Sequence, residues 1–176
     1  MARMVDLKNK ATQKLVADSI HSTFSSFFKF EPHLESVKLG ISSNTDFKKR
    51  AISGIMALVD CGIKGTFSVG LSKESALKML SNFYGEKLTS LDDPRVIEGI
   101  AEIANVAHGL FKEQLNKRGY RFKMCLPMVV VGANHSAFSQ DNSPALTLKF
   151  ESAVGEIVAE VILQTEPAAK KKKKVA

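Results

Sequence analysis

Hydrophobic and polar positions follow two periods along this chain, and they divide it into helices and strands in a repeated order. Helical spacing of apolar residues runs over residues 12–28 and 94–116, and Ser72 can cap a shorter helix that ends at Gly85. Strand-like apolar runs cover residues 37–41, 51–60, 63–71, 122–131, 146–150 and 157–163. The predicted order is a long helix and three strands, a short helix, and again a long helix and three strands.

Two short sequence matches indicate that this order is an internal repeat. AlaAspSerIleHis at 17–21 resembles AlaGluIleAlaAsn at 101–105, and ValLysLeuGly at 37–40 resembles ValValValGly at 129–132, in the same order. The alternative is an unrelated α+β domain with similar elements. We favour the repeat and expect an α/β (α+β) sandwich, in which two long helices lie side by side on one antiparallel sheet.

The strand patterns also carry two finer expectations. Pro127 removes a backbone donor from the fourth strand, which restricts that strand to a sheet edge or a bulge. The last two strands, 146–150 and 157–163, are expected to form a hairpin that turns near Gly155.

Composition is that of one globular domain. The chain has 176 residues, of which 44% are hydrophobic and 24% charged. We expect a single domain over residues 1–166. No leader-like apolar region is present, and no apolar run approaches the ~18 residues that span a bilayer, so we expect a cytoplasmic protein. Cys61 and Cys125 lack metal-ligand spacing and are interpreted as free, buried thiols.

The net charge of +7 owes five charges to Lys170–Lys174. Residues 167–176 have no apolar periodicity, and we expect them to form a disordered lysine-rich tail. Such a tail can touch nucleic acid or acidic lipid, but we favour a solubilising role. The rest of the chain lacks the interleaved basic and aromatic pattern of nucleic-acid binders, so neither a nucleic-acid nor a membrane partner is expected.

The helix over 93–116 carries the main functional pattern. Asp93 suits the N-cap and Pro94 suits the first helical position. One apolar stripe contains Ile97, Ile100, Ala104, Ala107, Phe111 and Leu115. A second stripe, roughly a right angle or more away, contains Glu98, Glu102, Asn105, Gly109, Lys112 and Asn116.

Glu102 and Asn105 are the candidate site residues on this second stripe. Their three-residue spacing stacks the two side chains on neighbouring turns, so that both can enter one cleft together. An isolated pair of this kind is usually an ordinary solvated helix face, and the rest of the chain must favour a site. Gly99 and Gly109 each cost the helix about 1 kcal/mol, which indicates a reason in packing or close approach.

Other kinds of chemistry have no motif in this chain. It has no GxGxxG or GxxxxGK[ST] phosphate loop, no His or Cys spacing of a structural zinc site and no GxSxG elbow. His108 lies near the apolar stripe and is interpreted as a hydrogen-bonded boundary histidine. Any chemistry must therefore rest on carboxylate, amide or backbone groups, or on a partner, and no cofactor of its own is expected.

Three segments resemble the CheX branch of the CheC/CheX/FliY phosphatases of bacterial chemotaxis. They are the strand-turn-strand and short helix at 52–77, the Glu-x-x-Asn signature with its glycine at 102–109, and LeuProMetValValValGly at 126–132. The resemblance covers roughly residues 12–164. It implies a pseudo-symmetric sandwich and dephosphorylation of the aspartyl phosphate of a CheY-type response regulator.

The resemblance also implies the role of each site residue. Asn105 would orient a water for in-line attack on phosphorus, and Glu102 would pair with the receiver's phosphate-site lysine. The Mg²⁺ that neutralises the phosphoryl oxygens would belong to the partner receiver domain. Asp18 and His21 stand in the first helix where a two-site member has Glu and Asn, so we interpret that half as inactive. Leu110 replaces the Asn that often follows the signature glycine and would alter the rim of the site.

Two further expectations concern partners. The alternative to an enzyme is a non-catalytic CheX-like module that binds a receiver domain or a flagellar-switch component. The resemblance also implies a homodimer, because relatives of the CheX type are homodimers that join sheet edges, and we expect this chain to form one. The apolar strand 157–163 is expected near such an edge, because it needs covering.

Overall fold

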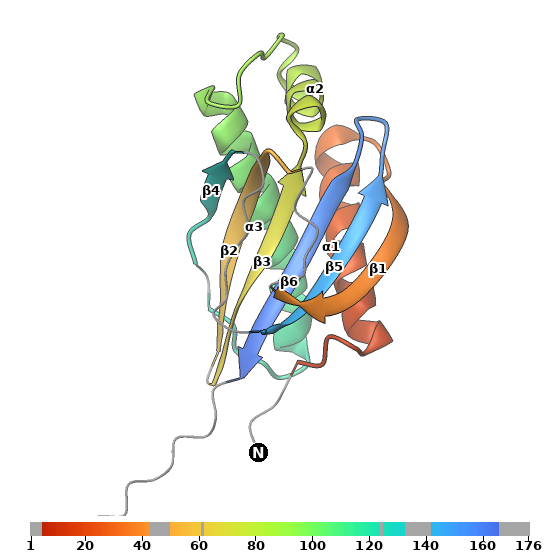
Figure 1. Cartoon of the computed structure of the whole chain (residues 1–176), viewed down its shortest axis with the longest axis vertical. Helices are drawn as coiled ribbons and strands as arrows, with labels where there is room; N and C mark the ends of the chain where they lie inside the picture. Colours follow the sequence, from red (N-terminus) through yellow and green to blue (C-terminus); the bar gives the residue numbers. More distant parts are fainter. Residues whose placement is uncertain (1–4, 43–49, 61, 124, 133–141, 166–176) are drawn as a thin grey trace, which may run out of the picture.

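The computed structural model describes residues 5–42, 50–60, 62–123, 125–132 and 142–165 (Figure 1). The elements are α1 (Lys10–Phe28), β1 (His33–Ile41), β2 (Ile52–Asp60), β3 (Ile63–Leu71), α2 (Lys73–Tyr84), α3 (Pro94–Lys117), β4 (Met128–Val131), β5 (Pro144–Glu151) and β6 (Ile157–Thr165). The predicted fold class is confirmed. The predicted tail at 167–176 and Cys61 lie outside the described residues, and Cys125 is a half-buried free thiol.

Six strands form one antiparallel sheet in the order β1-β5-β6-β3-β2-β4. Exchanging β1, β2 and β3 for β4, β5 and β6 reverses this order and leaves the neighbours unchanged, as a duplicated unit requires. Figure 1 shows α1 and α3 side by side behind the sheet, with α2 at one end of both. The predicted repeat is therefore present in the topology.

The outer strands differ in length from the sequence prediction. β1 begins at His33, directly after Pro32, and its polar first half pairs with β5 across a bulge between Leu34 and Ser36. β4 covers 128–131 rather than 122–131. The Asn116 side chain forms two hydrogen bonds with the backbone of Phe122. It accepts one from the N–H at 2.9 Å and donates one to the carbonyl oxygen at 3.3 Å. The edge position expected from Pro127 is confirmed.

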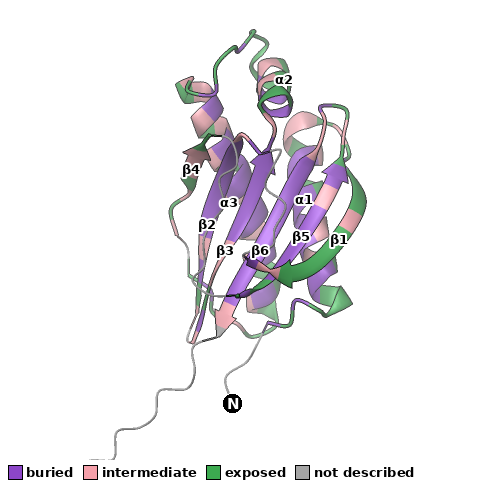
Figure 2. Cartoon of the chain, in the orientation of Figure 1, coloured by how far each residue is buried: buried purple, intermediate pink, exposed green. Residues whose placement is uncertain are grey.

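The strand at 157–163 does not lie near an edge, so that expectation is wrong. β6 is central, between β5 and β3, and its residues are buried on both faces of the sheet (Figure 2). A strand that is buried on both faces reads as a continuous apolar run, which explains why its sequence pattern indicated a need for covering. The hairpin between β5 and β6 turns at Gly155, whose φ of 116° favours glycine.

The hydrophobic core fills the space between the sheet and the two long helices. Its largest fully buried side chains include Phe24 of α1, Phe111 of α3, and Phe67 and Phe150 of the sheet. The Phe67 and Phe111 rings stack with centroids 5.6 Å apart. Within the described residues, none of the helices combines the length and apolarity that crossing a membrane requires.

His108 is a core residue rather than a boundary residue. It is fully buried, and its ring lies edge to face with the Phe67 ring at a centroid distance of 6.0 Å. Neither ring nitrogen has a hydrogen-bond partner in the described part of the chain. The interpretation of a hydrogen-bonded histidine is therefore wrong. Burial, with a smaller effect from the Lys112 ammonium, lowers the pKa of His108 from 6.5 to about 4.

We expect His108 to make the fold sensitive to mild acid. Between pH 6.5 and 4 the unfolded chain binds a proton that the folded chain excludes, so stability falls as the pH falls through this window. The loss between pH 7 and pH 5 should be about 2 kcal/mol. Urea unfolding of wild type and of His108→Leu at both pH values measures it, because the variant lacks this contribution. Equal pH dependence in the two proteins would contradict the assignment.

Candidate active site

The helix α3 holds both candidate residues, and its first turn forms as predicted. The Asp93 carboxylate accepts a hydrogen bond from the backbone N–H of Arg95 at 3.0 Å, and Pro94 occupies the first turn. The apolar stripe is buried except for Ile97, which is half-buried. The buried face also includes Val96, Ile103 and His108, so it is wider than predicted.

Glu102 and Asn105 lie on the side of α3 that remains accessible. Glu102 is exposed and Asn105 is half-buried. Neither side chain has a hydrogen bond or an ion pair within the described residues. The carboxylate and the carboxamide are therefore both free to bind groups of a partner.

The corresponding positions of the first helix are already paired. Asp18 accepts a salt bridge from Lys14 at 2.7 Å, and His21 Nε2 lies 3.9 Å from the Glu31 carboxylate. In the repeat, Asp18 and His21 occupy the positions that are equivalent to Glu102 and Asn105. Their different chemistry and their own partners favour the prediction that this half is inactive.

The two glycines of α3 have different explanations. A Cβ on Gly99 would lie 2.6 Å from Leu80 Cδ2, so Gly99 allows α2 to pack closely on α3. A Cβ on Gly109 would have no neighbour within 4 Å. Gly109 therefore has no packing reason within the described structure, and it leaves the surface one turn after Asn105 open.

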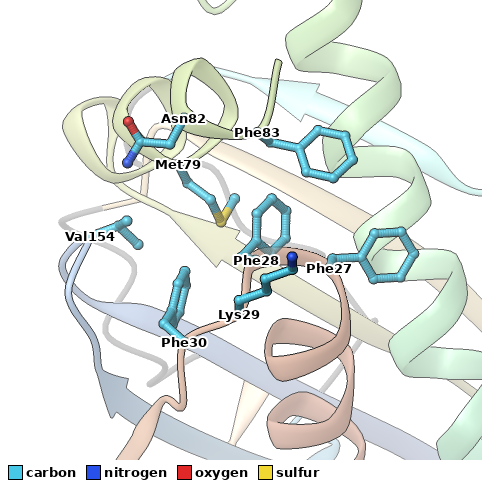
Figure 3. A pocket seen from close by; sticks show the side chains of 8 residues that line it. All are labelled: Phe27, Phe28, Lys29, Phe30, Met79, Asn82, Phe83 and Val154. Carbon is cyan, nitrogen blue, oxygen red and sulfur yellow. The ribbon is translucent and has the colours of Figure 1, made fainter. Parts of the chain in front are cut away.

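A hollow beside Glu102 was not predicted from the sequence. It has a volume of about 280 Å³, and aromatic rings from α1 and α2 form its walls: Phe27, Phe28, Phe83 and Tyr84. Glu98 and Glu102 of α3 line it as well. A second hollow of about 370 Å³ lies on the other side of Phe28 and Phe83, next to Lys29 and Asn82 (Figure 3). Adjacent aromatic residues at 27–28 and 83–84 are the signal that could have pointed to this cluster.

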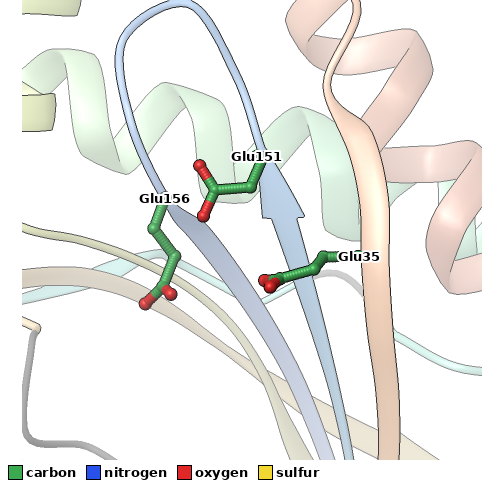
Figure 4. A group of neighbouring side chains, drawn as sticks. All are labelled: Glu35, Glu151 and Glu156. Atoms are coloured by element: carbon green, nitrogen blue, oxygen red, sulfur yellow. The ribbon is translucent and has the colours of Figure 1, made fainter.

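One group of carboxylates has the spacing of a metal site. Glu35 at the β1 bulge, Glu151 of β5 and Glu156 before β6 bring carboxylate oxygens within 4.8 Å of one another (Figure 4). Lys149 lies 3.5 Å from Glu156 and neutralises one of the three charges. These residues come from other elements than Glu102 and Asn105, and we assign no metal to them.

Comparison with known proteins gives this geometry a context. A family model described as chemotaxis phosphatase CheX matches residues 52–151, which include Glu102 and Asn105. A CheC-like superfamily protein from Shewanella sp. PV-4 is similar in structure, with 24% identity, a TM-score of 0.78, and coverage of 89% of this chain and 99% of that one. No curated protein sequence matches the chain.

Two further solved structures share the fold. The chemotaxis protein CheX from Vibrio vulnificus has 21% identity and a TM-score of 0.76, over 88% of this chain and 99% of that one. A structure of a CheX–CheY–BeF₃–Mg²⁺ complex from Borrelia burgdorferi matches with 20% identity and a TM-score of 0.72, over 87% of this chain and 97% of that one. At these identities the likeness establishes the fold.

Proposed function

The chain belongs to the CheX family of chemotaxis phosphatases, and we propose that it removes the phosphoryl group from the aspartyl phosphate of a CheY-type response regulator. The observation that carries this proposal is that Glu102 and Asn105 lie together on the accessible side of α3, without a hydrogen bond or an ion pair to any described residue, inside the segment that the family model matches. The solved complex of a similarly folded CheX with CheY supports a receiver domain as the partner. This reaction would take place in the cytoplasm.

The proposed chemistry needs positioning more than acid–base groups. The Asn105 carboxamide orients a water molecule in line with the bond between phosphorus and the receiver's aspartate oxygen. A bond forms from the water oxygen to phosphorus while the bond to aspartate breaks. The products are inorganic phosphate and a free aspartate carboxylate, and one proton of the water is released.

Glu102 fixes the geometry of docking. Its carboxylate accepts a charge-assisted hydrogen bond from the lysine ammonium at the receiver's phosphorylation site. The receiver's own Mg²⁺ supplies charge neutralisation at the phosphoryl oxygens, so this chain needs no metal for the step. The exposed position of Glu102 allows such an approach, whereas Asp18 is one methylene shorter and bound to Lys14.

A phosphate-release assay tests the proposal. Receiver domains from the organism that encodes this chain are phosphorylated with a small-molecule donor, and phosphate release is followed with and without the protein. We expect faster release from at least one receiver. Binding to a receiver without faster release would favour the alternative, a non-catalytic module that binds a receiver or a flagellar-switch component.

We also propose a homodimer that joins sheet edges, now through β1 rather than through residues 157–163. β1 is an edge strand of nine residues, and its side chains Leu34, Val37 and Leu39 are exposed by 38%, 36% and 48%. A long edge strand with exposed apolar side chains favours pairing with a second copy. We expect a dimeric mass in light scattering at micromolar concentration, and Leu39→Lys should shift it toward the monomer. A monomeric mass for wild type would contradict this proposal.

A further inference from the structure

We propose that the aromatic hollow beside Glu102 selects the receiver: it takes up one large apolar side chain of the receiver, while Glu98 binds a lysine or arginine next to that side chain. This inference rests on the proposed function, because it assigns the hollow to the same partner that Glu102 docks. It concerns partner choice and affinity, and it adds Glu98, Phe83 and Tyr84 to the residues that contact the receiver.

The hollow is preformed in the free protein. The rings of Phe28 and Phe83 meet edge to face at 5.4 Å, and those of Phe83 and Tyr84 do so at 5.2 Å. Phe27 stands 6.5 Å from Phe83 and joins α1 to this wall (Figure 3). Because the rings hold one another in place, a receiver side chain would bind there with little cost in ordering the protein. A volume of about 280 Å³ suits one Leu, Met or Phe side chain.

Aromatic side chains are concentrated and partly exposed at this point of the surface. Five of the eleven phenylalanines belong to one network of ring contacts here, made of Phe24, Phe27, Phe28, Phe30 and Phe83. Phe83 is 49% exposed and Tyr84 is 38% exposed, although both are large enough to fill a core. Exposed aromatic rings around a preformed hollow are typical of the anchor positions of protein interfaces.

The charges at the hollow indicate what lies beside the apolar side chain. Glu98 and Glu102 both line it and are four residues apart on α3, a spacing at which two like charges destabilise a helix. Neither carboxylate is bound to a cation within the described residues. Elsewhere on the same helix Glu113 is paired with Lys117 at 2.7 Å. A second cation from the receiver would relieve the repulsion that this pair retains in the free protein.

The second hollow does not fit the same partner chemistry. It is lined by Lys29 and Asn82 and carries no carboxylate among its lining residues. An apolar side chain flanked by a cation is therefore favoured on the side of Glu98 and disfavoured on the side of Lys29. Of the two hollows, the first is the one that shares a residue with the candidate active site, because Glu102 belongs to that site and also lines this hollow.

Binding measurements with matched variants test the inference. The probe is a panel of labelled receiver domains from the organism that encodes the chain, each treated with beryllofluoride and Mg²⁺ to mimic the phosphorylated state. Phe83→Ala is compared with Val59→Ala, which removes another exposed apolar side chain (37% exposed), near the β2–β3 turn at the far end of the sheet from α2 (Figure 1). Glu98→Gln is compared with Glu113→Gln.

We expect Phe83→Ala to raise the Kd about 10-fold, in the range of interface anchors, and Val59→Ala to change it less than about twofold. In turnover assays the loss should fall on KM, in contrast to Asn105→Ala. Glu98→Gln should raise the Kd severalfold at low salt, with a smaller effect at high salt. Its urea midpoint should stay equal or rise, because the like charge is gone, so that affinity and stability move in opposite directions.

The outcomes separate this inference from the proposed function. Equal Kd values for Phe83→Ala and Val59→Ala, or for Glu98→Gln and Glu113→Gln, would overturn the inference and leave the phosphatase proposal standing. Wild-type binding without phosphate release would overturn the catalytic proposal alone, since the Kd comparison still applies. If no receiver of the panel binds wild type, both fail.

Discussion

Asn105→Ala should lower the rate of receiver dephosphorylation by on the order of 100-fold while leaving the fold intact. The carboxamide is half-buried and makes no hydrogen bond within the described structure, so its removal leaves no buried group without a partner. The free energy of unfolding should therefore change by less than about 0.5 kcal/mol. Phosphate release under single turnover, with urea unfolding in parallel, measures the two effects separately.

Neighbouring variants give this prediction its controls. Glu102→Ala should weaken both docking and turnover, because we propose that its carboxylate binds the receiver's lysine. Asp18→Ala removes an exposed carboxylate at the equivalent place of the first helix and should do little. Equal phosphate release by wild type and Asn105→Ala from a verified receiver would show that the catalytic assignment is wrong. The binding-module alternative would then take its place.

Features with local causes could be predicted from the sequence. The start of α3 depends on Asp93 and Pro94, and the β5–β6 turn depends on Gly155, so neighbouring residues alone determine them. The position of Glu102 and Asn105 on an accessible side follows from the period of the helix. The repeat could also be predicted from the sequence, because each copy keeps the same order of elements.

Features that depend on distant pairing could not be predicted. The central place of β6 results from its pairing with both β5 and β3, and the residue pattern of a strand does not say which strands flank it. The start of β4 could not be predicted, because the Asn116 side chain competes for the backbone of Phe122. The aromatic hollow joins segments near residues 27, 83 and 100, which come together only when α1, α2 and α3 pack.

The close approach of α3 to the sheet leads to the second large effect that we expect. Gly54 of β2 faces this helix, and a Cβ there would lie 2.5 Å from Ala104 Cβ and 2.7 Å from the Ile100 carbonyl oxygen. Both contacts are in the turns that flank Glu102. One is a backbone atom that cannot rotate away, so a larger residue must displace the helix itself.

Gly54→Val should therefore destabilise the fold by about 3 kcal/mol, at the upper end of the usual cost of overpacking. Gly40→Val is the matched control, because a Cβ at Gly40 in β1 would have no described neighbour within 4 Å and valine favours a strand. The control should be neutral or slightly stabilising in urea unfolding.

The folded fraction of Gly54→Val should also lose phosphatase activity, since a shift of α3 moves Asn105 away from the position in which we propose that it orients water. Activity is best compared at equal concentrations of folded protein, so that the loss of stability does not enter the rate. Similar urea midpoints for Gly54→Val and Gly40→Val would contradict the close approach. A destabilised variant with full activity per folded molecule would show instead that the site tolerates displacement of the helix that carries it.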